Sequence, residues 1–191
     1  MRHDNFIPVP RYVQIQARGY LPHWQVDEAV YFVTFRLRDS LPREVAFQLR
    51  EERELLLRKA RPVERAQLDR AFALRLDRHL DAGGGACLLR AHGELVAGAL
   101  KHFDRARYEL HAWCVMPNHV HVLLYLANGR ALPSIIHSWK SYTAHVIGRG
   151  PIWQKEYFDR VIRSPQEYAD TKAYILRNPE KAGLRDWLWV G

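Results

Sequence analysis

The stretch HAWCVMPNHVHVLLYL, residues 111–126, decides the fold of this chain. It belongs to two runs rich in β-branched, aromatic and aliphatic residues, 108–116 and 119–126, which are separated only by Pro117 and Asn118. Two such runs with a two-residue connection predict an antiparallel β-hairpin. The remaining elements are placed outward from this hairpin.

The second run carries two histidines on one face of the predicted strand. Side chains two residues apart on a strand point to the same side of the sheet, so His119 and His121 face one way. Val120, Val122 and Leu124 alternate with them and are expected to form the core face, which leaves the histidines beneath whatever covers the other face. Two neutral imidazoles side by side supply half of a divalent metal site. On this pattern alone, a surface or stacked pair of histidines without a metal is an equally good interpretation.

Hydrophobic periodicity predicts the other elements. In chain order they are a strand over 29–37, helices over 43–80 broken near Arg61 and Pro62, a helix over 94–107, a helix over 132–147 and a strand over 157–162. Dense charges of both signs in the first helical region are interpreted as a solvated helix face. A last helix begins with Ser164 as N-cap and Pro165 in the first turn. It is expected to end at Asn178, because a following proline disfavours helical geometry.

The order strand, helices, strand, strand, helix, strand, helix indicates an α+β fold, the split βαββαβ plan with one helix appended. Helices on one face of an antiparallel sheet would leave the opposite face free for a site. A chain of 191 residues can bury one sizeable core, so a single domain is expected over 29–191. Residues 1–28 contain three prolines and no sustained periodicity, which predicts an extended N-terminal arm.

The chain carries a formal net charge of +8, and its isoelectric point is about 9.7. An excess of Lys and Arg is what a polyphosphate partner requires, so nucleic acid is the leading partner class. A basic soluble protein without such a partner is an equal alternative on charge alone.

The two cysteines, Cys87 and Cys114, form no CxxC pair, which argues against a disulfide framework and against a cysteine-based zinc site. The beginning of the chain has no apolar signal region, and no run of about 18 apolar residues occurs. We therefore expect a cytoplasmic protein that neither enters nor crosses a membrane.

The last predicted helix carries a second chemical group. Tyr174 and Asn178 are four residues apart and share a face, with Asp170 one turn earlier. A phenol held over a histidine-bound metal could attack phosphorus if it is deprotonated and if a Lewis acid polarises the phosphate. Asn178 could add a carbonyl oxygen to the metal. Periodicity alone favours the plainer interpretation, in which Tyr174 is a packing residue and Asn178 a helix stop.

Five spaced segments together resemble one family, the REP-associated tyrosine transposases, bacterial relatives of the single-tyrosine insertion-sequence transposases within the HUH endonucleases. The segments are PHWQ (22–25), YFVTFRLRDSLP (31–42), HFDRARYELHAWCVMPNHVHVLL (102–124), IWQKEYFDRVIR (152–163) and YILRNPEKAGL (174–184). The resemblance implies a ferredoxin-like domain that recognises single-stranded DNA hairpins formed by repetitive palindromes. It also implies that His119 and His121 are the metal-binding HUH pair, that Tyr174 is the nucleophile and that Asn178 completes the metal site.

The resemblance further implies a reaction. With Mg²⁺ or Mn²⁺ at the histidine pair, Tyr174 would attack a single strand and form a 5′-phosphotyrosine and a free 3′-OH, which a second 3′-OH could reverse without ATP. Single-strand binding combines basic and aromatic side chains. The candidate DNA-binding residues are Arg11, Tyr12, Lys140, Trp153, Arg160 and Arg163.

Two other classes of function stay open at this point. A hairpin-DNA-binding regulator without turnover would not need Tyr174 over a metal, and a metal-dependent hydrolase would use water and leave no covalent adduct. The short connection through Ser164 to the helix of Tyr174 favours a monomer that uses its own tyrosine. A dimer that exchanges this helix is the alternative.

Overall fold

The computed structural model describes residues 13–18, 21–127 and 129–191. Its centre is a sheet of four strands in the order β4-β5-β3-β6, and every neighbouring pair is antiparallel. The strands are β3 (Ala29–Arg36), β4 (Glu109–Val115), β5 (His119–Leu126) and β6 (Phe158–Val161). The two middle strands, β5 and β3, come from distant parts of the sequence. The expected hairpin and the ferredoxin-like α+β fold are confirmed.

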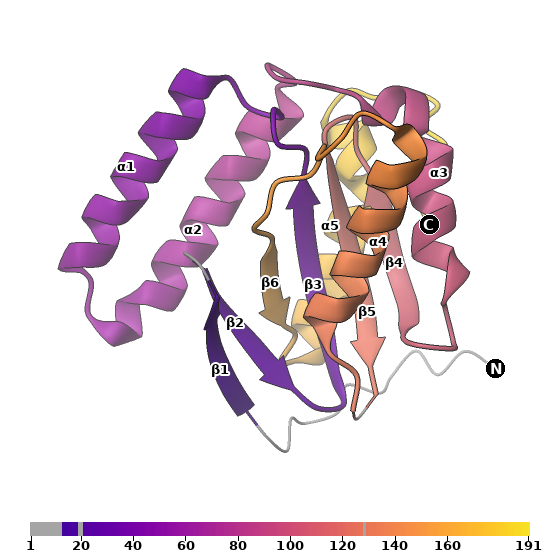
Figure 1. The fold of residues 1–191 in the computed structure, drawn as a ribbon. Helices are drawn as coiled ribbons and strands as arrows, with labels where there is room; N and C mark the ends of the chain where they lie inside the picture. The colour runs from indigo at the N-terminus through magenta and orange to yellow at the C-terminus, as the bar shows by residue number, and fades with distance from the viewer. Residues whose placement is uncertain (1–12, 19–20, 128) are drawn as a thin grey trace.

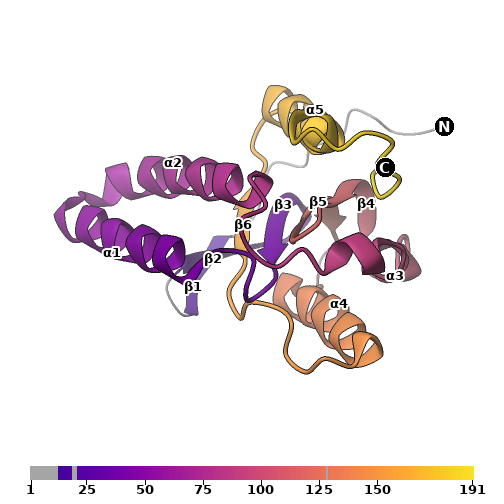
Figure 2. The ribbon, with the colours of Figure 1, turned by 90° about the horizontal axis from the view of Figure 1, so that it is seen from above.

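Helices cover both faces of this sheet (Figures 1 and 2). On one face lie α3 (Leu89–His102) and α4 (Leu132–Ile147), and on the opposite face lies α5 (Pro165–Lys181). The expectation of an open second face is therefore wrong, because the appended helix packs against β4 and β5 and closes it. Any site on that face is an enclosed one.

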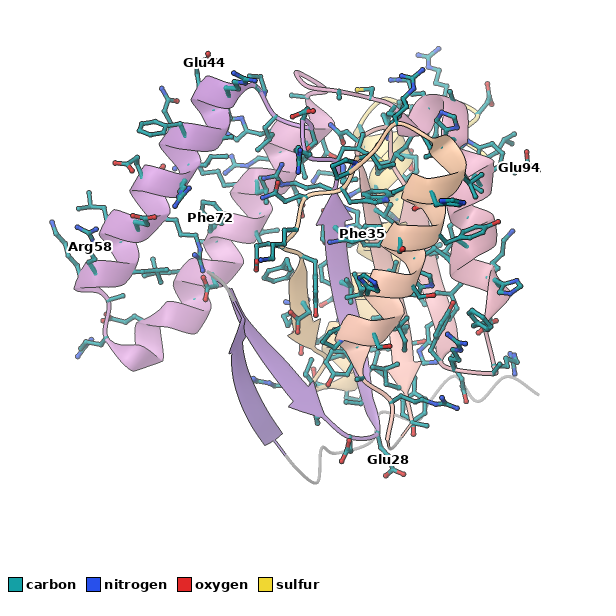
Figure 3. The ribbon with its side chains drawn as sticks, viewed as in Figure 1. Glu28, Phe35, Glu44, Arg58, Phe72 and Glu94 are labelled. Carbon is teal, nitrogen blue, oxygen red and sulfur yellow. The ribbon has the colours of Figure 1, made fainter. Side chains whose placement is uncertain are left out.

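A helical hairpin projects to one side of the sheet. It consists of α1 (Arg43–Lys59) and α2 (Pro62–Asp81), and it confirms the predicted break between two helices. The two helices share a small apolar cluster that includes Leu49, with Phe72 packed against it (Figure 3). Their outer faces carry charged residues such as Glu44 and Arg58, as the mixed-charge pattern indicated.

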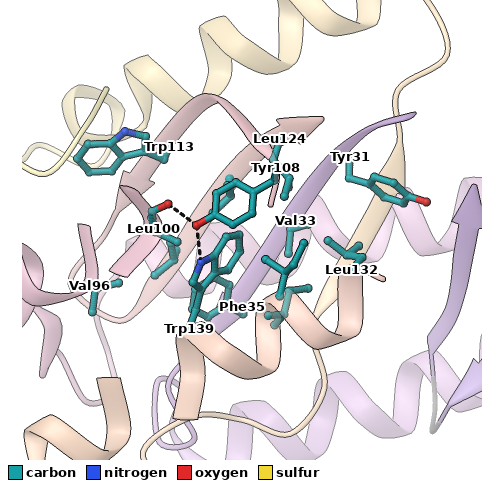
Figure 4. Close-up of a cluster of buried hydrophobic side chains, with 14 of the residues drawn as sticks. Tyr31, Val33, Phe35, Val96, Leu100, Tyr108, Trp113, Leu124, Leu132 and Trp139 are labelled. Atoms are coloured by element: carbon teal, nitrogen blue, oxygen red, sulfur yellow. Dashed lines mark hydrogen bonds between the residues drawn. The ribbon is translucent and has the colours of Figure 1, made fainter. Parts of the chain in front are cut away.

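The main core fills the space between the sheet and the pair α3 and α4. Val33 and Phe35 of β3 and the alternating Val120, Val122 and Leu124 of β5 are buried there, as the period of two predicts. Its polar atoms are paired: the Tyr108 hydroxyl donates to the Leu100 carbonyl at 2.6 Å and accepts from the Trp139 indole at 3.0 Å (Figure 4).

The predicted bounds of two helices were wrong. Helix α3 begins at Leu89 and ends at His102, each about five residues before its predicted position, and it bends at His92, whose φ and ψ are −125° and 17°. Helix α5 continues through Pro179 to Lys181. A proline removes one backbone donor, and here it does so within the last turn, where the remaining hydrogen bonds hold the helix. Asn178 thus belongs to the helix and is buried.

The N-terminal region contains a two-stranded hairpin in place of a plain extended arm. Its strands are β1 (Val13–Arg18) and β2 (Leu21–Val26), which form a sheet of their own. Residues 1–12 lie outside the described part of the chain. In the described ranges, no helix is long and apolar enough to cross a membrane.

The last residues add to the edge of the sheet. The Gly191 and Trp113 backbones exchange two hydrogen bonds, and the Val115 amide donates to the Trp189 carbonyl at 2.9 Å. The Trp189 ring lies against Gly93 of α3, so closely that a Cβ atom on Gly93 would lie 2.3 Å from it. The C-terminal tail therefore depends on a glycine in a neighbouring helix.

Replacing Gly93 should test this packing. We expect Gly93→Ala to lower the free energy of unfolding by about 1–3 kcal/mol, because the new methyl group overlaps the Trp189 ring. The control is Gly98→Ala in the same helix, where a Cβ atom meets nothing within 4 Å, and a gain of up to about 1 kcal/mol from helix propensity is expected. Urea denaturation of both variants measures the difference, and equal effects would contradict the packing.

Candidate active site

The two histidines of β5 lie on the sheet face that α5 covers. The register pairs His119 with Arg36 and His121 with Thr34 of β3. Both imidazoles are fully buried, with 0% of their surface exposed. The structure thus places the pair on the face opposite the main core, as the alternation predicted, but in an enclosed position.

Hydrogen bonds orient both rings. The Asn118 amide nitrogen donates to the Leu80 carbonyl at 2.9 Å, which turns its oxygen toward His119 Nδ1 at 2.7 Å. That oxygen can only accept, so His119 Nδ1 carries the proton and its Nε2 has a free lone pair. His121 Nδ1 lies 2.8 Å from the Thr34 hydroxyl, and the two Nε2 atoms lie 3.0 Å apart.

This arrangement fits a divalent metal ion. Two ligands at about 2.1 Å from a metal and at right angles to each other are about 3.0 Å apart. Burial lowers the pKa of His119 well below its ordinary value and that of His121 to about 3, so both rings are neutral, as metal ligands must be. The Asn118 and Thr34 contacts are the outer-shell bonds that such ligands usually make.

Asn178 is the polar side chain that fits a third position. It is fully buried, and among the described residues neither its oxygen nor its nitrogen forms a well-directed hydrogen bond, although the amide partly offsets the burial that raises the pKa of the nearby Tyr174 hydroxyl. Buried amides are nearly always paired. In the described ranges, no three His, Cys, Asp or Glu side chains gather as a metal-binding group. An amide oxygen, water or a phosphate oxygen would therefore have to complete the coordination.

Helix α5 brings Tyr174 to the histidines. The Ser164 hydroxyl caps the helix by accepting from the Glu167 amide at 3.1 Å, as predicted, and Pro165 occupies the first turn. Four turns of helix follow to Asn178. The Tyr174 ring stands edge-on to His121, with 5.4 Å between ring centroids, so the predicted nucleophile and the histidine pair do come together.

Two carboxylates of α2 also reach this site, and sequence reasoning missed both. The Tyr174 hydroxyl donates to Asp77 Oδ2 at 2.9 Å, and Asp77 is only 7% exposed. One turn later, Asp81 Oδ1 lies 4.0 Å from His119 Nε2 and has no hydrogen-bond partner within the described part of the chain. The four-residue spacing of the two aspartates was a signal, but it was hidden among the mixed charges of a helix that was interpreted as a solvated face. Asp170, noted in the sequence, is exposed and accepts a hydrogen bond from Gln166.

Burial sets the protonation of these groups. It raises the pKa of Asp77 and of Asp81 to about 6 each. Burial is also the largest cause that raises the pKa of Tyr174 above its ordinary value, and the nearby Asp77 acts in the same direction. Tyr174 is therefore a neutral phenol in this state, and the two aspartates are mainly ionised at neutral pH.

Cavities lined by described residues adjoin the site, and Asp77 reaches the following pair. One, of about 500 Å³, is lined by residues that include Phe32, Phe158, Arg160 and Tyr174. The other, of about 430 Å³, lies between the helical hairpin and the sheet, and its basic lining consists of Arg36, Arg38, Arg50 and Arg53. Asp77 lines both cavities.

The predicted DNA-binding residues fall into three groups. Arg160 lines the larger cavity, with contacts of 3.3 Å to Glu167 and 3.2 Å to Thr171, and Arg163 is exposed at the start of α5. Arg11 and Tyr12 lie outside the described residues.

The structure corrects the other two assignments. The Trp153 ring is buried, donates to the Thr143 hydroxyl at 2.9 Å and packs on Phe35, so it is a core residue and not a platform for a base. Lys140 points inward and donates to the Gln154 and Lys155 carbonyls at 2.9 and 3.2 Å. Burial lowers its pKa to about 8, and it closes a loop instead of presenting a charge to a phosphate.

Comparisons with known proteins agree with the fold and with the resemblance seen in the sequence. Residues 94–178 match the family model described as "Transposase IS200 like". A REP-associated tyrosine transposase of Escherichia coli (strain K12) is 30% identical over 106 residues, which cover 52% of this chain and 64% of that protein. The match thus spans less than two thirds of the relative.

Solved structures were compared as well. A REP-associated tyrosine transposase bound to a REP hairpin is similar over 92% of this chain and 80% of its own, with 21% identity and a TM-score of 0.58. This likeness supports the fold. A putative transposase of Deinococcus radiodurans is 18% identical over 84% of this chain and 94% of its own, with a TM-score of 0.33.

The two buried asparagines of the site should respond differently to truncation. Asn118→Ala removes two hydrogen bonds and should lower the free energy of unfolding by roughly 1–3 kcal/mol. Asn178→Ala removes an amide without partners, so in the presence of EDTA it should change the free energy by less than about 0.5 kcal/mol or stabilise the protein. Urea denaturation measures both, and an equal loss in the two variants would show that Asn178 is paired.

Proposed function

We propose that this chain, which resembles the REP-associated tyrosine transposases, is a tyrosine transposase that cleaves and rejoins single-stranded DNA at palindromic hairpins. The observation that carries the proposal is the meeting of three groups from two separate elements. The phenol of Tyr174, from α5, stands against the neutral pair His119 and His121, from β5. The Tyr174 ring also packs against Phe32, but packing alone would not require its hydroxyl to reach the buried Asp77.

The proposed reaction is the one that the resemblance to the tyrosine transposases implies. Tyr174 Oη attacks a phosphorus atom of a single strand, and the bond between phosphorus and the 3′ oxygen breaks. The products are a 5′-phosphotyrosine and a free 3′-OH. Because the phosphotyrosine is itself a phosphodiester, attack by a 3′-OH reverses the step and joins strands without ATP.

His119, His121 and Asn178 would hold the divalent metal, Mg²⁺ or Mn²⁺. When bound, this metal supplies Lewis-acid polarisation of the scissile phosphate. The residues of the chain contribute the orientation: Asn118 and Thr34 lock the two imidazoles, and α5 carries Tyr174 and Asn178 on one face. Because the tyrosine lies against the histidines of its own chain, the proposed enzyme acts as a monomer.

Three observations support DNA as the partner: the net charge of the chain, the cavity beside Tyr174 and the similarity to transposases. The net charge of +8 suits a phosphate backbone, and the cavity of about 500 Å³ beside Tyr174 offers Phe32, Phe158 and Arg160 to an unpaired nucleotide. The structurally similar transposase is described as bound to a REP hairpin. A hairpin with a single-stranded flank is accordingly the substrate class that we propose.

Removal of the phenol oxygen should abolish the reaction. With a labelled hairpin oligonucleotide and Mn²⁺, Tyr174→Phe is expected to form no covalent adduct and no cleaved strand, because the hydroxyl is the nucleophile. Its affinity for the hairpin in a gel-shift assay should stay within about twofold of that of the unaltered protein, because the ring is kept. Tyr142→Phe, at an exposed tyrosine of α4, is the matched control and should react normally.

A denaturing gel separates the three classes of function. A protein–DNA adduct that requires Tyr174 supports the transposase. Free ends without an adduct, undiminished in Tyr174→Phe, would indicate a hydrolase, and binding without any cleavage by the unaltered protein would indicate a regulator.

Metal binding should depend on the histidine pair. We expect His121→Ala to weaken Mn²⁺ binding by more than about 100-fold, since loss of an outer-shell partner alone costs 10- to 100-fold. The exposed His137 of α4 provides the control, and His137→Ala should bind as the unaltered protein does. Electron paramagnetic resonance of free Mn²⁺ measures the affinity without DNA, and equal binding by the two variants would remove the metal from this position.

A further inference from the structure

We propose that Asp77 is a catalytic residue that accepts the Tyr174 proton during DNA cleavage and returns it during rejoining. This inference rests on the proposed function. It concerns a side chain on α2, which lies outside residues 94–178, the region that the transposase family model matches.

The geometry is that of a proton donor and its acceptor. The Tyr174 hydroxyl donates to Asp77 Oδ2 at 2.9 Å, within the range required for direct transfer. This bond joins residues 97 positions apart in the chain, from two helices that approach the sheet from different sides. It is a tertiary contact with no local cause.

The histidines are poorly placed for this role. His121 Nδ1 is engaged with the Thr34 hydroxyl, and its Nε2 faces His119 Nε2 at 3.0 Å. The His119 Nδ1 proton is held by Asn118. Tyr174 meets His121 through the edge of its ring, with an interplanar angle of 69°, and turns its hydroxyl toward α2.

The surroundings of Asp77 suit a base. The side chain is only 7% exposed, so little water competes for the phenol proton. Burial raises the pKa of Asp77 to about 6, above that of an exposed aspartate and still low enough for ionisation at neutral pH. Because burial and Asp77 also raise the pKa of Tyr174, the proton would leave as the bond to phosphorus forms and not before. Asp77 also lines both cavities, so it lies where a strand and its phosphate would pass.

The end of α2 is held in place by a residue of the metal site itself. Leu80, three residues after Asp77, is buried, and its carbonyl accepts from the Asn118 amide at 2.9 Å. The same Asn118 orients His119 through its oxygen. The Asn118 side chain therefore fixes the position of the end of α2, and with it Asp77, relative to His119.

The step balances without a further reactant. In cleavage, the O–H bond of Tyr174 breaks and its proton passes to Asp77 Oδ2, while Tyr174 Oη forms the bond to phosphorus. The bond from phosphorus to the 3′ oxygen breaks, its electron pair stays on that oxygen, and the oxygen takes a proton from water. In rejoining, a 3′-OH loses its proton to water and attacks phosphorus, and the departing Tyr174 oxygen recovers the proton from Asp77.

The test compares two substitutions at one position. Asp77→Asn keeps size and a hydrogen-bond acceptor for Tyr174 but cannot take its proton, so adduct formation should slow by about 10²- to 10⁴-fold in a single-turnover assay. Asp77→Glu keeps the carboxylate and should retain at least a tenth of the unaltered rate. Gel-shift affinity for the hairpin and the far-ultraviolet circular dichroism spectrum should stay unchanged in both.

A control on the same helix is Glu64→Gln, which changes a carboxylate of the first turn that pairs with Arg61 and lines neither cavity, so its adduct rate should be normal. If Asp77→Asn does not fold, Asp77→Ser serves as the second neutral variant. An adduct rate within threefold of normal, or a faster one, in a folded neutral variant would overturn the inference. A fall of similar size in the neutral and Glu variants would also overturn it, because contact geometry and not the carboxylate would then matter.

Failure of the proposed function gives a different pattern. If the unaltered protein forms no adduct, or if Tyr174→Phe still cleaves, the transposase proposal itself is wrong. If the adduct forms, requires Tyr174 and persists in Asp77→Asn, only the role of Asp77 is wrong.

Discussion

The antiparallel register between β3 and β5 is the constraint on which the candidate site depends. It pairs Thr34 with His121 and Arg36 with His119, so that both imidazoles point away from the main core. A slip of one residue would exchange the two faces of β5, placing the histidines among apolar side chains and Val120 and Val122 beneath α5. The burial of alternating aliphatic residues, which stabilises the sheet, therefore also orients the chemistry.

The enclosed site combines groups that would be unfavourable without a ligand. Among the residues that the structure describes, the buried Asn178 amide and one buried oxygen of Asp81 have no hydrogen-bond partner. Such features lower stability, and they cluster at functional positions because a bound cation or phosphate can satisfy them. The protein supports them with paired groups nearby, above all the two hydrogen bonds of Asn118.

Sequence patterns gave reliable information where a single period dominated. Helix α4 has the predicted bounds, and Ser164 caps α5 as expected. The patterns gave wrong predictions where tertiary packing outweighed a local sequence preference. Pro179 did not end α5, because its missing donor falls in the last turn. Trp153 was predicted to stack on a DNA base because it is aromatic, yet its ring packs in the core beside Phe35.

The sequence by itself determined the hairpin, the alternation that puts His119 and His121 on one face, and the helix that carries Tyr174, because each follows from a period of two or 3.6 residues and from local capping. Only the tertiary structure decided that this face is covered and that Asp77 and Asp81 of α2 join the site. The physical reason is that no local pattern encodes which side of a charged helix meets a distant phenol. That choice depends on how α2 docks, through contacts such as the Leu80 carbonyl with Asn118.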